Sequence, residues 1–550
     1  MPTNTPVREA PFSLIPQKLQ PKDPVEPELR VEQIQGNILA GFNKDNQTLL
    51  FLKITDRKRF KAWLRVVLPF VATVDEVLKF NRLFKQIRTR RCVETRTVLA
   101  TWLNIAFSFQ GLAQITDDAD RIKDTAFKEG LASRSKSLND PVQGEGSPKK
   151  WVIGGKSTEA DVVIIIGSDS AEEMEASVVS WESSIDGAGP LRGQSGPSGA
   201  RVIFKQRGAT LPDPLRGHEH FGFLDGVSQP GIKGTFGPSK ELLTPKQNPA
   251  DRGQGKPGQD RLWPGEFVFG YPAQDPTSTD NPGKVRKGGL DWMDDGSFLV
   301  FRRLRQDVDA FHEFLEDTGN ELNLGPELFG AKCVGRWKSG APVERASKQD
   351  NSAMSRDDCA NNAFDFQKDT IPKNPSPGSS DQCKDNFPNN LAKKDVDGLV
   401  CPFAGHIRKA YPRDDESLKP KGVKFPPNEA NTETHRLLRR GIPFGTPFDP
   451  TIPSDNGNRG LLFMAYQTSI ENQFEFVIKN WVNNPDFKEK ESGHDPILGQ
   501  SDRSNRERSL KVPLGKGQEQ VVRLPQDFVI PTGGGYFFAP SIRALERLSE

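Results

Sequence analysis

Apolar and polar positions in the first half of the chain follow one another in a way that predicts alternating strands and helices. Short apolar runs predict strands at 49–54, 101–108, 161–166 and 200–204. Apolar residues at helical spacing predict a helix over 57–68. A second helix is expected to follow Asp169, whose side chain suits an N-cap, and to run to Ser183. This order of elements is compatible with a ferredoxin-like α+β sandwich.

The second half repeats this pattern of elements without a close repeat of the sequence. We expect strands at 296–304, 460–467 and 535–539, and helices at 307–317 and 474–480. The prediction is therefore a flexible leader and two ferredoxin-like domains, at 1–30, 31–215 and 216–550. Long polar inserts interrupt the pattern at 133–150, 240–259, 273–288 and 344–397. Loops of this length are usually functional or disordered, and we expect the last insert to extend the surface or cover the edge of a cavity.

The composition narrows the classes of function. The 550 residues are enough for two or three domains, and 27% charged residues leave a formal net charge of only +2. This balance gives no field that would favour nucleic acid as a partner. Apolar runs stay shorter than the ~18–20 residues of a membrane span, and the first residues lack the basic and apolar regions of a secretion signal. We therefore expect a cytoplasmic protein, with export by another route left open.

Five cysteines lie far apart in the sequence and show no metal-binding spacing. Free thiols in a reducing compartment are the simpler interpretation. Cys359 and Cys383 both lie in the insert at 344–397 and could pair, but their spacing does not decide between a disulfide and two thiols.

The segment 217–230 contains a candidate for proton-transfer chemistry. Asp225 stands in an apolar run between Gly222 and Gly226. Glycines allow the main chain to bend or to approach another group closely. An apolar environment is expected to raise the pKa of a carboxyl group, because it disfavours the charged form. The alternative is a structural turn in which Asp225 only fixes the main chain.

Two further segments contain candidates whose role the residues alone leave open. His406 follows Ala404 and Gly405, small residues that would allow a flat cofactor to approach the main chain. It is either a single axial ligand of a haem or an ordinary histidine at the start of a helix. Arg439 and Arg440 precede a Gly-Ile-Pro turn. A buried arginine there would either pair with an internal carboxylate or stabilise negative charge that develops in a reaction.

Several of these segments, taken in order, carry a resemblance to a known family. Gly-Phe-Leu-Asp-Gly at 222–226 has the pattern G-x-x-D-G. The segments around His406 and Arg439 come later in the sequence, in that order. Further matching stretches lie at 34–42, 334–342, 459–467 and 495–500. From about residue 31 onwards the chain thus resembles the dye-decolorizing (DyP-type) haem peroxidases. Its long inserts and the lack of a visible signal peptide resemble the longer, bacterial-type members.

The resemblance implies a fold and a cofactor. The fold would be two ferredoxin-like domains in a dimeric α+β-barrel-type arrangement, with antiparallel sheets and peripheral helices. The cofactor would be one haem b in the C-terminal domain, with His406 as the iron ligand and Asp495 as the partner of its second ring nitrogen. Three apolar residues would contact the haem or pack against its cavity: Leu461, Phe463 and Phe223.

The resemblance also implies a reaction. The enzyme would reduce hydrogen peroxide and oxidise small organic donors, such as dyes and phenols, by one-electron steps. Asp225 would transfer the proton of the peroxide, and Arg439 would stabilise the developing negative charge. The distance back from Pro443 favours Arg439 over Arg440 in this role. Because the proton acceptor is an aspartate, we expect an acidic pH optimum.

Bulky donors would not fit beside the peroxide, so electrons are expected to leave through an aromatic residue near the surface. Trp481 and Tyr466 are the candidates, although either could be a core aromatic. The sequence allows for a homo-oligomer. Two other functions remain open: a haem-binding or haem-handling protein with incidental peroxidase activity, and a metal-free α+β binding protein.

Overall fold

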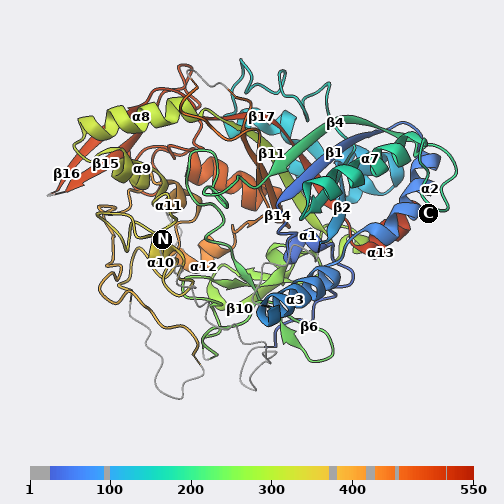
Figure 1. The fold of residues 1–550 in the computed structure, drawn as a ribbon, viewed down its shortest axis with the longest axis horizontal. Helices are drawn as coiled ribbons and strands as arrows, with labels where there is room; N and C mark the ends of the chain where they lie inside the picture. Colours follow the sequence, from blue (N-terminus) through green and yellow to red (C-terminus); the bar gives the residue numbers. More distant parts are fainter. Residues whose placement is uncertain are drawn as a thin grey trace.

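The computed structural model describes residues 25–91, 99–249, 251–370, 381–415, 428–452, 457–515 and 517–550. Most of the predicted leader at 1–30 therefore lies outside the described residues, as do Cys92 and part of the insert at 344–397. The described chain is organised around one large antiparallel sheet, to which both halves contribute strands (Figure 1).

The N-terminal half supplies four strands to this sheet. They are β1 (Asn46–Ile54), β2 (Thr101–Phe107), β3 (Val162–Ser168) and β4 (Ala200–Ala209). Their spatial order is β2-β3-β1-β4, and all neighbours are antiparallel. This is the strand order of a ferredoxin-like unit, as the sequence predicts.

The C-terminal half supplies the rest of the sheet with the same order. The strands are β11 (Ser297–Gln306), β12 (Leu438–Arg439), β13 (Ile442–Phe444), β14 (Gly460–Gln467) and β17 (Val529–Ala539). β11 lies between β14 and β17, and the short strands β12 and β13 both pair with β14. The predicted pair of ferredoxin-like units is thus confirmed.

The two halves meet at both ends of their strand sets. β17 pairs with β2 through Phe538 and Phe107. On the other edge, Gly208 of β4 lies against β13, where an added Cβ would be 2.7 Å from Cγ2 of Ile442 and 2.9 Å from the carbonyl oxygen of Pro443. Only a glycine allows such a close approach of two edge strands. The arrangement is therefore barrel-like.

Helices and short hairpins surround the sheet. The α-helices are α1 (Gly36–Leu39), α2 (Arg57–Val67), α3 (Val74–Arg91), α4 (Phe109–Ile115), α5 (Thr125–Glu129), α6 (Leu131–Arg134), α7 (Ala171–Asp186), α8 (Val308–Glu321), α9 (Pro326–Val334), α10 (Ser352–Ser355), α11 (His406–Ala410), α12 (Asn428–Glu433) and α13 (Ile542–Ser549). Shorter strands are β5 (Gly231–Ile232), β6 (Thr235–Phe236), β7 (Glu241–Leu242), β8 (Arg261–Leu262), β9 (Pro272–Asp275), β10 (Ser278–Val285), β15 (Arg508–Gly515) and β16 (Gln518–Leu524). Figure 1 shows α2, α7 and α13 at one end of the molecule, and α8, α9 and the hairpin β15–β16 at the other.

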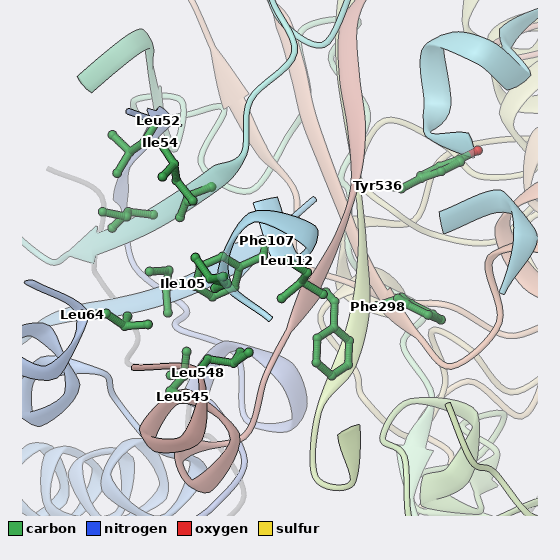
Figure 2. Close-up of a cluster of buried hydrophobic side chains, with 14 of the residues drawn as sticks. Leu52, Ile54, Leu64, Ile105, Phe107, Leu112, Phe298, Tyr536, Leu545 and Leu548 are labelled. Carbon is green, nitrogen blue, oxygen red and sulfur yellow. The ribbon is translucent and has the colours of Figure 1, made fainter. Parts of the chain in front are cut away.

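The core forms because apolar side chains are buried on both faces of the sheet: along β1, Leu50 and Leu52 belong to one cluster, and Leu49 and Phe51 to another. Ile105 and Phe107 alternate along β2, and Leu64 of α2 and Leu545 of α13 pack towards them (Figure 2). The same cluster includes Phe298 of β11, so the core continues from one half into the other (Figure 2). At about 1.5–3 kcal/mol for each large apolar side chain, burial of this cluster fixes the relative position of the two units.

The structure corrects three predictions of local structure. Ser170, not Asp169, caps α7, because its hydroxyl accepts from the Glu173 N–H at 3.3 Å while Asp169 pairs with Lys44. The helix predicted at 474–480 is present but longer and mostly π-helical, in η6 (Ile470–Phe474) and η7 (Val477–Val482). The insert at 273–288 is no plain loop, since it forms most of the hairpin β9–β10.

The insert at 344–397 is a folded part of the molecule where it is described. Phe364 and Phe366 are buried in a cluster with Trp337. The guanidinium of Arg345 forms a buried ion pair with Asp385 at 2.9 Å. A disulfide joins Cys359 and Cys383. The expectation of free thiols is therefore wrong for this pair, whereas Cys333 and Cys401 are free and buried.

Candidate active site

A cavity of about 290 Å³ lies in the C-terminal half, beside β11, β14 and β17. This volume is close to the lower end of the range typical of small-molecule and cofactor sites, roughly 300–1,000 Å³. Most of the side chains that line it are apolar, and a few are charged: Glu219, Asp225, Arg336, His406, Arg413 and Arg439 are among them. Segments far apart in the sequence thus converge on one apolar space with a few charged groups.

Asp225 and Arg439 form an ion pair on the wall of this cavity. Nη1 of Arg439 lies 3.0 Å from Oδ1 of Asp225, and Nη2 donates to the carbonyl oxygen of Ser228 at 3.0 Å. The main-chain N–H of Gly226 donates to the same Oδ1 at 2.6 Å. The predicted proton-transfer residue and the predicted arginine are therefore brought into direct contact.

The contact with Arg439 reverses the pKa shift expected for Asp225. Burial alone would raise the pKa of this carboxyl group, as predicted. The positive charge of Arg439 and the hydrogen bonds from Gly226 and Arg439 outweigh burial, so the pKa lies below its usual value. The expectation of a raised pKa is wrong, because the sequence did not show that the arginine reaches this carboxylate.

The turn that carries Asp225 is held by side chains that the sequence did not single out. Both oxygens of Glu219 accept main-chain N–H groups, from Phe221 and Phe223, each at 2.9 Å. Nε2 of His312, on α8, lies 3.1 Å from the carbonyl oxygen of Phe221. Gly222 and Gly226 adopt φ values of 92° and 76°, which side chains rarely allow. The only sign of this support in the sequence was the acidic residue Glu219 in the same segment as Asp225.

Arg439 and Arg440 point in different directions. Arg439 ends β12 and Arg440 follows it, and successive residues of an extended chain face opposite sides, so only one of them can reach the cavity. Arg440 donates instead to the last carbonyl groups of α1, at 2.9 Å to Asn37, 3.0 Å to Ile38 and 2.9 Å to Leu39. The prediction that Arg439 is the residue of the site thus agrees with its place in the cavity wall.

His406 begins α11 and lines the cavity. Its Nδ1 lies 2.7 Å from Oδ2 of Asp495, and the second oxygen of Asp495 accepts from the N–H groups of Ile497 and Leu498. Burial favours the neutral imidazole, but Asp495 outweighs this effect and raises the pKa of His406. The expected histidine–carboxylate pair is present, and Asp495 does not engage the other ring nitrogen of His406, Nε2.

Three apolar residues predicted for the site also line the cavity. Leu461 and Phe463 alternate along β14 with the buried core residues Leu462 and Met464, as the two-residue period of a strand requires. Phe223 belongs to the turn of Asp225. All three therefore lie where a flat apolar group could pack.

Among the described residues, the hydrogen bonds of two buried arginines in the cavity wall all go to neutral oxygens. Arg336 donates to the carbonyl oxygens of Gly340 and Asn361, at 2.9 and 2.7 Å, and to Oδ1 of Asn362 at 2.7 Å. Arg413 donates to the same Oδ1 at 2.6 Å. Burial lowers the pKa of Arg336 to about 9. Two clustered cations of this kind suit a ligand that carries carboxylates.

The aromatic residues proposed to carry electrons to the surface are buried. Trp481 is 3% exposed and packs in a cluster with Phe487, and Tyr466 is 1% exposed within the core of the sheet. Neither lines the cavity. The prediction of a surface role is therefore wrong for both, and the alternative of core aromatics holds.

Two histidines, His406 and His435, line the cavity, and neither belongs to a cluster of metal ligands among the described residues. In the described ranges, no group of three or more His, Cys, Asp or Glu residues could hold a metal ion by itself. A metal bound through His406 would need its other ligands from elsewhere, and a tetrapyrrole supplies four of them. No helix of the described residues is long and apolar enough to span a membrane.

Comparison with known proteins decides the family. Residues 33–189 match the model of the DyP dimeric alpha+beta barrel domain, and residues 414–494 match that of the C-terminal domain of Dyp-type peroxidases. The dye-decolorizing peroxidase msp1 of Mycetinis scorodonius is 31% identical, over 94% of this chain and 87% of its own length. The chain belongs to the dye-decolorizing peroxidase family. It is therefore a peroxidase, and the predicted class of oxidoreductase is confirmed.

Other dye-decolorizing peroxidases agree with this assignment. The structure of an ancestral D-type dye-decolorizing peroxidase superposes with a TM-score of 0.73, at 33% identity, over 94% of this chain and 99% of that chain. The dye-decolorizing peroxidase of Mycena epipterygia is 31% identical over 96% of this chain and 89% of its own length. The dye peroxidase DyP2 of the bacterium Amycolatopsis is 26% identical over 94% of this chain and 96% of its own length. The fungal relatives are thus more similar than this bacterial one, which does not support the expected likeness to bacterial-type members.

Proposed function

We propose that the chain binds haem b, reduces hydrogen peroxide, and oxidises small organic donors such as dyes and phenols by one-electron steps. One observation carries this proposal: Asp225, Arg439 and His406 line the same apolar cavity, and Asp495 holds His406 through its Nδ1. A proton acceptor, a fixed positive charge and a metal ligand are the groups that peroxide cleavage at a haem requires.

The residues present fit a haem. Nε2 of His406 is the proposed iron ligand, and Asp495 holds the imidazole through Nδ1 and makes it a stronger electron donor. Leu461, Phe463 and Phe223 are the proposed apolar contacts of the ring. We assign Arg336 and Arg413 to the propionate groups, because both are buried cations whose hydrogen-bond partners are neutral.

Asp225 and Arg439 have different roles in the proposed reaction with peroxide. When bound, the haem supplies an iron that takes up peroxide and later accepts electrons from the donor. Asp225 accepts the first proton of peroxide at Oδ2, the oxygen that is not engaged by Arg439 and Gly226, and returns it to the oxygen that leaves as water. The guanidinium of Arg439 stabilises the negative charge on the departing oxygen. Its ion pair also keeps Asp225 ionised, and therefore ready to accept, at low pH.

The experiment that tests the proposal is a titration of the purified protein with haemin, followed by the Soret absorption. The wild-type chain and a His218→Ala control, which changes a half-buried histidine outside the cavity wall, are expected to bind one haem each. His406→Ala is expected to bind haem weakly or not at all. The haem-loaded protein should then oxidise a phenol and an anthraquinone dye only when peroxide is added. A protein that stays colourless would favour the metal-free binding protein, and one that binds haem without turnover would favour haem handling.

The domain bounds, the oligomeric state and the compartment are parts of the same proposal. We propose domains at 31–215 and 216–550, supported by the stretch between β4 and β5 that separates the two sets of large strands; limited proteolysis tests it. A homo-oligomer is proposed, to be tested by light scattering. The Cys359–Cys383 disulfide favours the exported alternative over the cytoplasm, because disulfides persist in oxidising compartments. Fractionation of the producing cells tests this point.

A further inference from the structure

Tyr411 differs from the other aromatic residues around the cavity because it is a tyrosine in the cavity wall. It follows directly after α11, the helix that begins with His406, and both residues line the cavity. The side chain is half-buried. Among the described residues that line the cavity there is no tryptophan and no second tyrosine. Tyr411 is thus the readily oxidised side chain of the site.

The hydroxyl of Tyr411 has a proton acceptor in place. It donates to Oδ2 of Asp260, a buried carboxylate. Nη1 of Arg436 donates to the same oxygen at 2.9 Å, and the guanidinium carbon lies 3.6 Å from the centre of the Tyr411 ring. Ring and carboxylate are therefore held in a fixed relation to each other. Burial raises the pKa of Tyr411 well above its usual value, so the phenol carries its proton before any oxidation.

The other three tyrosines of the chain lack this combination. Tyr271 and Tyr536 also donate to carboxylates, at 2.7 Å to Asp295 and 3.0 Å to Glu475, but neither lines the cavity. The Tyr466 oxygen instead accepts from the Asn37 side chain at 3.5 Å. These residues supply matched controls, because each has a buried phenol outside the cavity wall.

A tyrosine loses an electron readily only when its proton leaves in the same step, because the oxidised phenol is a strong acid. We infer that Tyr411 is a redox-active residue, which gives one electron to the peroxide-oxidised haem while its phenolic proton moves to Oδ2 of Asp260. The product is a neutral tyrosyl radical beside a protonated Asp260. One electron and one proton from an organic donor, a phenol or a dye, restore the tyrosine, and the proton on Asp260 is released. This inference rests on the proposed function.

The step would move the site of donor oxidation from the haem to the cavity wall. A cavity of about 290 Å³ that also holds a haem leaves little room for a dye. A radical on Tyr411 lies at the cavity wall rather than at the cavity centre. Trp481 and Tyr466 lie outside the wall.

Electron paramagnetic resonance tests the inference. Haem-loaded protein is mixed with hydrogen peroxide in the absence of a donor and frozen, and the Soret band is followed in parallel. A tyrosyl radical is expected in the wild type, with hyperfine splittings that collapse when the tyrosines are ring-deuterated. The signal should be lost in Tyr411→Phe and kept in Tyr466→Phe and Tyr536→Phe. Asp260→Asn should lower the radical yield, and Asp260→Glu should restore part of it.

The possible results separate this inference from the proposed function. A Soret band that does not respond to peroxide in the wild type would contradict the proposed function and the inference with it. A Soret band that responds without a tyrosyl radical, or a radical that persists unchanged in Tyr411→Phe, would overturn the inference and leave the peroxidase intact. Because ring deuteration is done in the wild-type chain, its result does not depend on whether any variant folds.

Discussion

Asp225 reaches the cavity because several neighbouring groups hold its turn, and the two glycines are only part of this arrangement. Glu219 accepts two main-chain N–H groups of the turn, and Arg439 holds the carboxylate itself. The sequence identified Asp225, His406, Asp495 and Arg439 through motif segments. It did not give the sign of the pKa shift of Asp225, because that sign depends on a contact between residues 214 positions apart.

The pH dependence of the reaction follows from this contact. The pKa of Asp225 lies below its usual value because Arg439 outweighs burial, so the proton-accepting form persists to low pH in the wild type. Removal of the positive charge in Arg439→Leu leaves burial, which raises the pKa. We expect the acidic limb of kcat/KM for peroxide to move to higher pH in this variant. If the acidic limb stays in place or moves to lower pH, then the ionisation of Asp225 does not set this limb.

At the scale of elements, the strand of Arg439 is positioned by α1. Arg440 donates to the carbonyl groups at the end of this helix, so the N-terminal unit fixes the strand that carries the site arginine. The sequence predicted β14 to the residue and the presence of both arginines. The resemblance favoured Arg439 over Arg440, but the physical reason was not visible in the sequence, because it depends on the pairing of β12 with β14. The π-helical turns after β14 carry no distinct signal in the sequence, since their apolar spacing resembles that of an α-helix.

Replacement of Arg440 should weaken the link between the two units. Arg440→Leu leaves the carbonyl groups of Asn37, Ile38 and Leu39 without this donor, and the expected loss in the free energy of unfolding is about 2 kcal/mol. Arg440→Lys should recover only part of it, because an ammonium cannot reproduce the planar set of donors. Urea unfolding measures both changes. Arg543→Leu, on the exposed side of α13, is the matched control and should change stability little.

At the scale of the whole molecule, the insert at 344–397 connects a disulfide to the cavity. Cys359 stands close in sequence to Asn361 and Asn362, whose oxygens accept from Arg336 and Arg413. The sequence predicted an insert that extends the surface or covers a cavity edge, and left the disulfide open. Its folded course could not be predicted, because the buried Arg345–Asp385 pair and the contacts of Phe364 join residues without any regular periodicity.

Loss of the disulfide should loosen both the insert and the haem. The bridge closes a loop with a sequence separation of 24 residues, and the chain-entropy model gives about 3 kcal/mol for a loop of this size. We expect Cys359→Ser with Cys383→Ser to unfold at lower temperature and to release haem faster to an acceptor globin. Treatment of the wild type with a thiol reductant should reproduce the effect, and the double variant should no longer respond to it. Equal rates of haem release in all samples would contradict a link between the disulfide and haem binding.

The central claim is that Asp225 moves the proton of peroxide in the cavity that His406 shares. Its most direct test is the second-order rate constant for the reaction of the haem-loaded protein with hydrogen peroxide, followed in the Soret band by stopped flow. Asp225→Asn should lower this constant by roughly 10²–10⁴-fold, the usual contribution of a positioned acid–base group. Asp317→Asn, which changes an exposed aspartate on α8, should leave it unchanged. A wild-type rate in Asp225→Asn would contradict the account and leave Arg439 as the residue that acts alone.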